Sequence, residues 1–310
     1  MTRRRPSARL LLMVAWVAVH FLAPLHAQVD TGHLRLFKYL MGTSMRVEIY
    51  GATSSVRQQA ADEAFAAIAQ VDRGMSDYRD DSELARLNAS AGRGAVPVSG
   101  PLFALLAAGE RVWHASGGAF STVSGGRGGD RPIVLDATTG SVRIGPAGGR
   151  VSLNGLAKGF AAEVAAGSLV RRGLSGTVDT GSVQYMVGRP PGKSTWTVGI
   201  AHPDRRGALL GAVELEAGAV ATVTRATVPI DPRTQRPTGP AVSATVISRD
   251  GTLADALSRA ALVLGPSAGL ELLARFPDTW GVIVARGADG QLSIAVSAGH
   301  TRAFHPSSPL

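Results

Sequence analysis

The stretch VSLNGLAKGFAAEVAAGSLVRRG, residues 151–173, changes its hydrophobic period in the middle. Its first residues alternate between apolar and polar as in a strand, and the apolar residues after Gly155 recur at helical spacing. Gly155 and Gly159 bracket the strand-to-helix turn, where small residues let a ligand approach the backbone. The N-terminus of a helix favours an anion, and Lys158 adds a positive charge. This pattern predicts a phosphate or pyrophosphate site; the alternative is a tight turn with a solvated lysine.

The remainder of the chain mixes helical and strand-like segments without a regular βαβ rhythm. Amphipathic spacing predicts helices over residues 56–71, 101–116, 253–264 and 267–276. Alternating or β-branched runs predict strands near residues 34–37, 45–49, 133–144, 150–153, 176–187, 196–201, 212–216, 219–223, 242–247, 280–285 and 292–296. This mixture predicts an α+β fold with antiparallel pairing.

Residues 1–27 have the pattern of a secretory signal peptide. Arg3–Arg5 form a basic region, Leu10–Val19 is apolar, and Ala27 is a small residue suited to cleavage. We therefore expect export to the periplasm, with residues 28–310 as the mature chain. The alternative is an uncleaved segment that anchors the protein at the inner membrane, although Pro24 makes the apolar run short for a membrane span.

Composition excludes several classes of protein. The chain has no cysteine, so disulfides, cysteine metal ligands and a lipidated N-terminal cysteine are excluded. Four of the 32 basic residues lie in the signal, which leaves 28 basic and 23 acidic residues, a net charge of +5. No dense basic stripe with interleaved aromatic residues is present, so we expect no nucleic-acid partner.

Asp255 stands among apolar residues near the start of a predicted helix, in the sequence LADALSRAALVLG. A carboxylate in apolar surroundings usually has a partner or a metal, because burying it unpaired is costly. Oxygen-only ligation would suit Mg²⁺ that bridges phosphates. The alternative is an aspartate in the first turn that the helix dipole stabilises.

Tyr78 lies in the polar stretch MSDYRDDSELARLN, residues 75–88, which leads into a short helix that Asp81 or Ser82 would cap. A tyrosine in such a loop either packs against the protein or stacks on a flat ligand. The sequence leaves both roles open.

Six motifs resemble, in order, those of the FAD:protein FMN transferases, the ApbE-type flavin transferases. Two of them are Leu153–Gly159, similar to the family's Gly-Gly-Ile-Ala-Lys-Gly turn, and Leu253–Ser258, which matches its Leu-Ala-Asp-Ala-Leu-Ser helix start. The others are Met41–Thr43, Ser76–Arg79 with residues 82–88, Gly117–Phe120 and Asp231–Thr234. The resemblance implies a single ApbE-like, T-fold-like α+β domain with antiparallel sheets packed by helices.

The resemblance also implies an activity and a site. Such enzymes move FMN from FAD onto a threonine or serine hydroxyl of an acceptor protein, such as a redox-complex subunit or a flavin-carrying domain, and release AMP. By analogy, the Ala157 carbonyl and the Asp255 carboxylate would bind Mg²⁺, and Asp255 and Lys158 would serve catalysis. The implied flavin-nucleotide contacts are Met41, Tyr78, Ala119, Phe120, Ser121, Gly155, Lys158 and Asp231.

The sequence departs from the family pattern at polar positions. Arg259 stands where the family has a threonine one turn after the aspartate, Val228 where it has a histidine, and Ser121 where it has an aspartate. Arg259 would bring its own charge to the metal site. Two functions follow: an exported flavin transferase, or a non-catalytic flavin- or nucleotide-binding paralogue that acts as a carrier or partner module.

Overall fold

The computed structural model describes residues 32–307, apart from residues 125–132, 146–147 and 229. The predicted signal at residues 1–27 lies outside this described part. The chain from Gly32 onward forms one compact unit.

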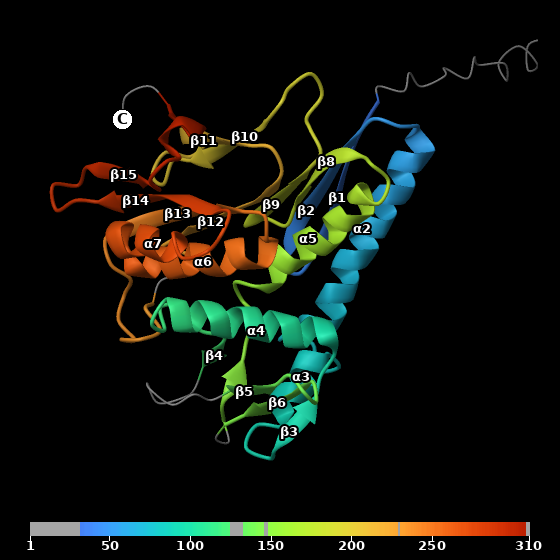
Figure 1. Cartoon of the computed structure of the whole chain (residues 1–310), viewed down its shortest axis with the longest axis vertical. Helices are drawn as coiled ribbons and strands as arrows, with labels where there is room; N and C mark the ends of the chain where they lie inside the picture. The colour runs from blue at the N-terminus through green and yellow to red at the C-terminus, as the bar shows by residue number, and fades with distance from the viewer. Residues whose placement is uncertain (1–31, 125–132, 146–147, 229, 308–310) are drawn as a thin grey trace, which may run out of the picture. The chain divides into compact units, whose positions relative to one another are not determined.

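An eight-stranded sheet in the order β1-β2-β8-β9-β12-β13-β14-β15 is the centre of the fold (Figure 1). Every neighbouring pair in it is antiparallel, as the mixed pattern of the sequence predicts. Its strands are β1 (His33–Leu40), β2 (Thr43–Tyr50), β8 (Ser175–Asp179), β9 (Val183–Val187), β12 (Gly218–Thr224), β13 (Ala241–Ser248), β14 (Thr279–Arg286) and β15 (Leu292–Val296).

Helices and a second, smaller sheet pack against this sheet on opposite faces (Figure 1). The helices are α2 (Ser54–Met75), α5 (Ala157–Val170), α6 (Gly251–Leu264) and α7 (Pro266–Leu273). The smaller sheet consists of β10 (Trp196–Ala201), β11 (Leu209–Leu215) and β16 (Phe304–Pro306), which follows the turn η1 (Thr301–Ala303). Because both faces are covered, every residue of β13 is buried: Val246 packs on the helix side and Ile247 on the small-sheet side.

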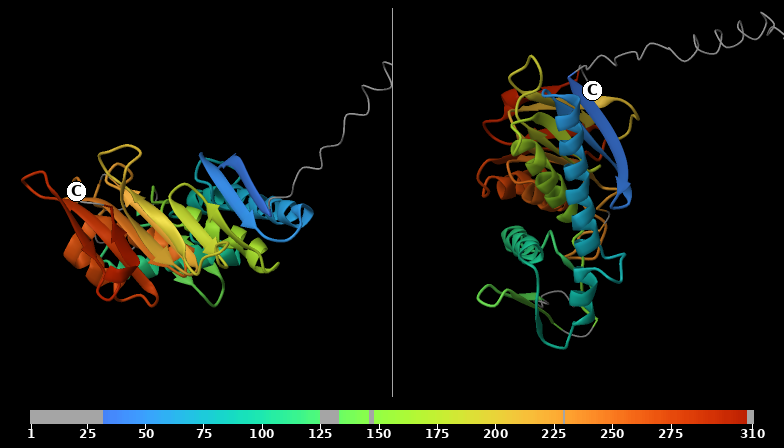
Figure 2. Two further views of the ribbon diagram at one scale, coloured as in Figure 1. Left: turned by 90° about the horizontal axis from the view of Figure 1, so that it is seen from above. Right: turned by 90° about the vertical axis from the view of Figure 1, so that its right-hand side faces the viewer.

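The segment between α2 and α5 lies beyond the helices, away from the eight-stranded sheet (Figures 1 and 2). It contains α3 (Glu83–Ala89), α4 (Gly100–Ala115), the strands β3 (Ala95–Pro97), β5 (Ile133–Asp136) and β6 (Ser141–Ile144), and the pair β4 (Val123–Ser124) and β7 (Arg150–Val151). Helix α4 packs on α6, and β7 leads the chain into α5. Within the described residues, no helix is long and apolar enough to cross a membrane.

Helix α5 is packed through alanines. Ala161, Ala162, Ala165 and Ala166 are buried, whereas Val164 is 38% exposed. Small side chains let helix axes approach closely, and α5 packs against both α2 and α6. The strand predicted before the turn is shorter than its apolar alternation suggests, because β7 ends at Val151 and α5 begins at Ala157.

Candidate functional site

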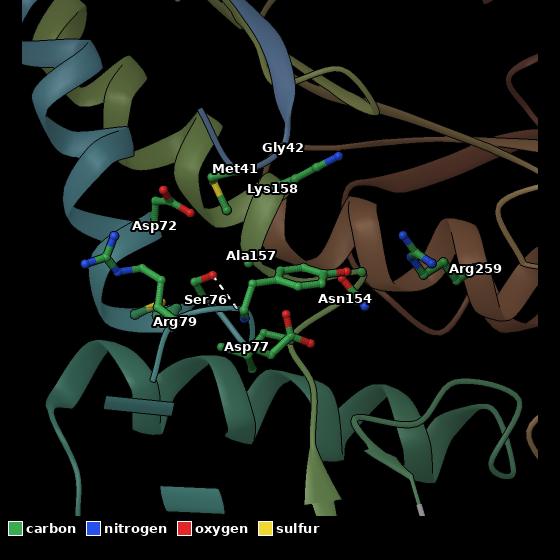
Figure 3. A pocket seen from close by; sticks show the side chains of 14 residues that line it. Met41, Gly42, Asp72, Ser76, Asp77, Arg79, Asn154, Ala157, Lys158 and Arg259 are labelled. Atoms are coloured by element: carbon green, nitrogen blue, oxygen red, sulfur yellow. Dashed lines mark hydrogen bonds between the residues drawn. The ribbon is translucent and has the colours of Figure 1, made fainter. Parts of the chain in front are cut away.

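A cavity of about 370 Å³ opens at the N-terminus of α5 (Figure 3). Its walls come from the β1–β2 turn, the loop after α2, the turn before α5, and α6. Its volume lies in the range of small-molecule sites. Five of the residues predicted to bind the flavin nucleotide or the metal line it: Met41, Tyr78, Gly155, Ala157 and Lys158.

The turn before α5 requires a glycine at position 155 for two reasons. Gly155 has a φ of +93°, a conformation that side chains disfavour. A Cβ at this position would also lie 2.3 Å from Cδ of Arg259 and 3.0 Å from Cε2 of Phe120. The aliphatic part of Arg259 therefore lies directly against the backbone of the predicted phosphate turn.

The loop after α2 is tied to the same turn by hydrogen bonds. Ser152 Oγ donates to Asp77 Oδ2 at 2.9 Å, and Arg150 Nη2 donates to the Asp77 carbonyl at 2.9 Å. Of the two predicted caps for α3, Ser82 takes the role: its Oγ accepts from the Ala85 N–H at 2.9 Å. The two bonds to Asp77 hold the loop after α2 next to the segment that leads into α5.

Tyr78 is 89% exposed in this loop, so the packing role is wrong for it. Its backbone N–H donates to Ser76 Oγ at 3.3 Å, as the dashed line in Figure 3 shows. Arg79 is ion-paired with Asp81 through two hydrogen bonds of 3.0 and 2.9 Å. The ring of Tyr78 therefore remains available for stacking on a ligand.

Asp255 is 1% exposed. It belongs to α6, but its carboxylate accepts a hydrogen bond from the backbone of α5. Its Oδ2 accepts from the backbone N–H of Gly159 in the first turn of α5, at 3.3 Å. The N-cap of α6 is Asp250, whose Oδ1 accepts from the Leu253 N–H at 2.8 Å. Asp255 is therefore not the first-turn aspartate of α6, and burial raises its pKa although Arg259, the Gly159 N–H and Lys158 oppose the rise.

Arg259 extends from α6 to the cavity, where Figure 3 shows it across from Asp72 and Arg79. Its Nε lies 3.8 Å from Asp255 Oδ1, and its side chain is 19% exposed. Both of these atoms are buried without a hydrogen-bond partner among the described residues. The cavity therefore contains a guanidinium that faces a fully buried carboxylate but forms no hydrogen bond with it.

The residues predicted to bind Mg²⁺ do not fit that ion. One oxygen of Asp255 accepts from the Gly159 N–H, and the other faces Arg259. A guanidinium is always charged and has no lone pair for a cation, so it would repel Mg²⁺ beside Asp255. In the described ranges, no group of three or more metal-binding side chains occurs.

Four of the other predicted contacts lie outside the cavity lining. Ala119 and Phe120 are 2% and 3% exposed, and Ser121 Oγ donates to the Val123 carbonyl. Asp231 accepts from Arg233 Nε at 3.0 Å and Nη2 at 2.7 Å, and these bonds lower the pKa of Asp231 despite its burial. Phe120 lies close to Gly155 and packs beside the turn before α5.

Two acidic residues that line the cavity, Asp72 and Asp77, were not predicted from the sequence as site residues. Asp72 lies near the end of α2, where the helical pattern suggests only packing, and Asp77 faces the cavity beside Ser152. The only sequence signal for Asp77 is its place in the Ser76–Arg79 motif. Its pairing with a residue 75 positions later depends on tertiary structure.

The sequence matches a protein-family model and a curated relative. The model of the ApbE family matches residues 41–126 and 131–284. A FAD:protein FMN transferase of Treponema pallidum (strain Nichols) is 30% identical over 291 residues, which cover 77% of this chain and 80% of the relative.

Solved structures show the same fold. The flavin transferase ApbE from Vibrio cholerae has a TM-score of 0.76 at 22% identity, over 87% of this chain and 99% of that one. The apo form of Pseudomonas stutzeri flavinyl transferase ApbE has a TM-score of 0.75 at 24% identity, over 88% and 96%. The predicted ApbE-like α+β fold is confirmed. With the family model and the Treponema relative, these similarities establish that the chain belongs to the ApbE family.

Proposed function

We propose that this protein transfers the FMN part of FAD to a threonine or serine hydroxyl of an acceptor protein and releases AMP. The relative from Treponema pallidum carries the name of this activity. The observation that carries the proposal is the cavity at the start of α5, which brings Lys158 and Arg259 together with the exposed Tyr78. Two cations and an aromatic ring in one cavity suit the phosphates and the flat rings of a dinucleotide.

In this reaction the acceptor oxygen forms a bond to the FMN phosphorus while the bond from that phosphorus to the oxygen of AMP breaks. The hydroxyl proton goes to solvent water, and AMP leaves with the electron pair of the broken bond. Negative charge grows on the phosphate oxygens, so fixed positive groups near them favour the transition state. Lys158 and Arg259 take this role, and Asp255 acts as a positioning residue for Arg259 and for the first turn of α5.

A second candidate is a protein that binds a flavin nucleotide without transferring it. The placement of Arg259 beside Asp255 favours this candidate, because the pair does not fit the Mg²⁺ site that the family resemblance implies. The two candidates share ligand binding and differ only in turnover.

Transfer separates the two candidates. The mature protein, incubated with FAD and a flavin-acceptor domain, should make the acceptor fluorescent in a denaturing gel and release AMP. Asp255→Asn should abolish the fluorescence because Arg259 loses the charge that holds it, and breaking a buried pair is costly. Asp204→Asn, which breaks the exposed pair with Arg286, is the matched control and should transfer normally. FAD binding without any fluorescent acceptor would favour the second candidate.

The proposal includes export, with the signal cleaved after Ala27. The basic and apolar regions of residues 1–27 support it. Intact-mass spectrometry of protein from a periplasmic fraction should give a chain that begins at Gln28. A full-length chain in the membrane fraction would indicate an uncleaved inner-membrane anchor, and a full-length chain in the cytoplasm would contradict export.

A further inference from the structure

The Arg259 side chain is mostly buried in the fold, with 19% of it exposed to solvent. Its side chain lies in the space that a Cβ of Gly155 would fill, and Phe120 also lies close to that position. The left-handed φ of +93° at Gly155 shapes the turn over which the arginine passes. The turn before α5 and the third turn of α6 therefore determine the position of the guanidinium together.

The hydrogen-bonding capacity of this guanidinium is unused. Arg259 Nε is buried without a partner, and so is Asp255 Oδ1, 3.8 Å from it. No hydrogen bond from the Arg259 side chain is formed within the described part of the chain, although a guanidinium carries five N–H donors. A buried donor without a partner is costly, so the unpaired Nε and the Nη groups that reach the cavity suit a site whose acceptor is a ligand.

The charged residues around Arg259 bear on the charge of that ligand. Asp255 compensates one positive charge from the buried side, and Lys158 lines the same cavity as Arg259. Asp72 and Asp77 also line the cavity, but Figure 3 shows Asp72 across the cavity from Arg259. Next to Arg259 and Lys158 the cavity therefore favours an anion, and the guanidinium disfavours a cation beside Asp255.

We infer that Arg259 binds the pyrophosphate of the flavin dinucleotide directly, beside Lys158, and that it supplies there the positive charge for which other sites use a divalent cation. Arginine suits this role because its planar fork donates two parallel hydrogen bonds to one phosphate. FAD binding by this chain is then independent of divalent cations. The inference rests on the proposed function only in the identity of the ligand.

The test is FAD affinity, measured by quenching of flavin fluorescence, in EDTA and in Mg²⁺. The wild-type protein should bind FAD with the same dissociation constant, within about twofold, in both buffers. Arg259→Gln should weaken binding in EDTA by about tenfold or more, since a hydrogen bond to a charged group is lost. Arg259→Lys, which keeps the charge without the fork, should lie between the two.

Arg172→Gln is the matched control. Arg172 is also ion-paired, with Glu63, and its side chain is 24% exposed, but it does not line the cavity. Its FAD affinity should equal that of the wild type. Circular dichroism and thermal unfolding of each variant separate a binding defect from a folding defect. If Arg259→Gln does not fold, the FAD affinity of Arg259→Lys tests the inference instead.

Two results would overturn the inference. One is a wild-type affinity that falls by tenfold or more when EDTA replaces Mg²⁺. The other is an unchanged affinity in folded Arg259→Gln. Neither result affects the proposed transfer, which is read separately from the fluorescent acceptor. A wild-type protein that binds no FAD in either buffer would instead refute the inference and the proposed function together.

Discussion

Gly159→Ala should lower the free energy of unfolding by about 3 kcal/mol or more, or prevent folding, because it forces α5 and α6 apart. A Cβ at Gly159 would lie 2.0 Å from the carbonyl oxygen of Gly251 and 3.0 Å from Cβ of Asp255. The carbonyl belongs to the backbone of α6, so no side-chain rotation relieves the overlap. The bond from the Gly159 N–H to Asp255 would be lost with it.

Gly167→Ala in the same helix is the matched control. There the nearest atom to the added Cβ would be Nη1 of Arg171, at 3.2 Å, the end of a flexible side chain. The substitution should be neutral or stabilising by up to about 1 kcal/mol, as alanine favours a helix over glycine. Denaturant unfolding measures both variants. A Gly159→Ala protein as stable as the wild type would contradict the close approach of α5 and α6.

Lys158→Ala should weaken FAD binding by about tenfold to a hundredfold, the loss expected for one charge-assisted hydrogen bond of about 1.5–3 kcal/mol. Lys158 lines the cavity in the first turn of α5, where the helix dipole also favours an anion. Its backbone carbonyl accepts from Thr180 Oγ1 at 3.1 Å, so the backbone remains held when the side chain is removed. Thermal stability without ligand should therefore change little.

Fluorescence titration with FAD measures this change, with Lys193→Ala, an exposed loop lysine outside the cavity, as the matched control. Raising the salt concentration should reduce the difference between Lys158→Ala and the wild type, because Lys158 is only half-buried and salt screens its charge. An unchanged affinity in Lys158→Ala would mean that the alternative from the sequence, a solvated lysine beside a tight turn, is correct.

The helices and the antiparallel sheet follow from local patterns. Periodicity located α2, α4, α6 and α7 to within a few residues, because an amphipathic helix must bury the stripe that its own spacing creates. Periodicity did not predict the shorter strands β3, β4 and β16. Each has two or three residues, too few for a period to show. These strands form only because a neighbouring strand is in place to pair with them.

The sequence by itself determined the family, the fold class and the turn before α5, since the glycines and Lys158 of that turn act over a few residues. Only the tertiary structure decided what the turn faces. Asp255 hydrogen-bonds to a residue 96 positions away, and Arg259 fills the space that Gly155 leaves open. Both contacts arise from the packing of α5 against α6, and that packing depends on buried side chains from the whole core. The pattern of a single helix therefore cannot distinguish a metal-binding aspartate from one that holds an arginine.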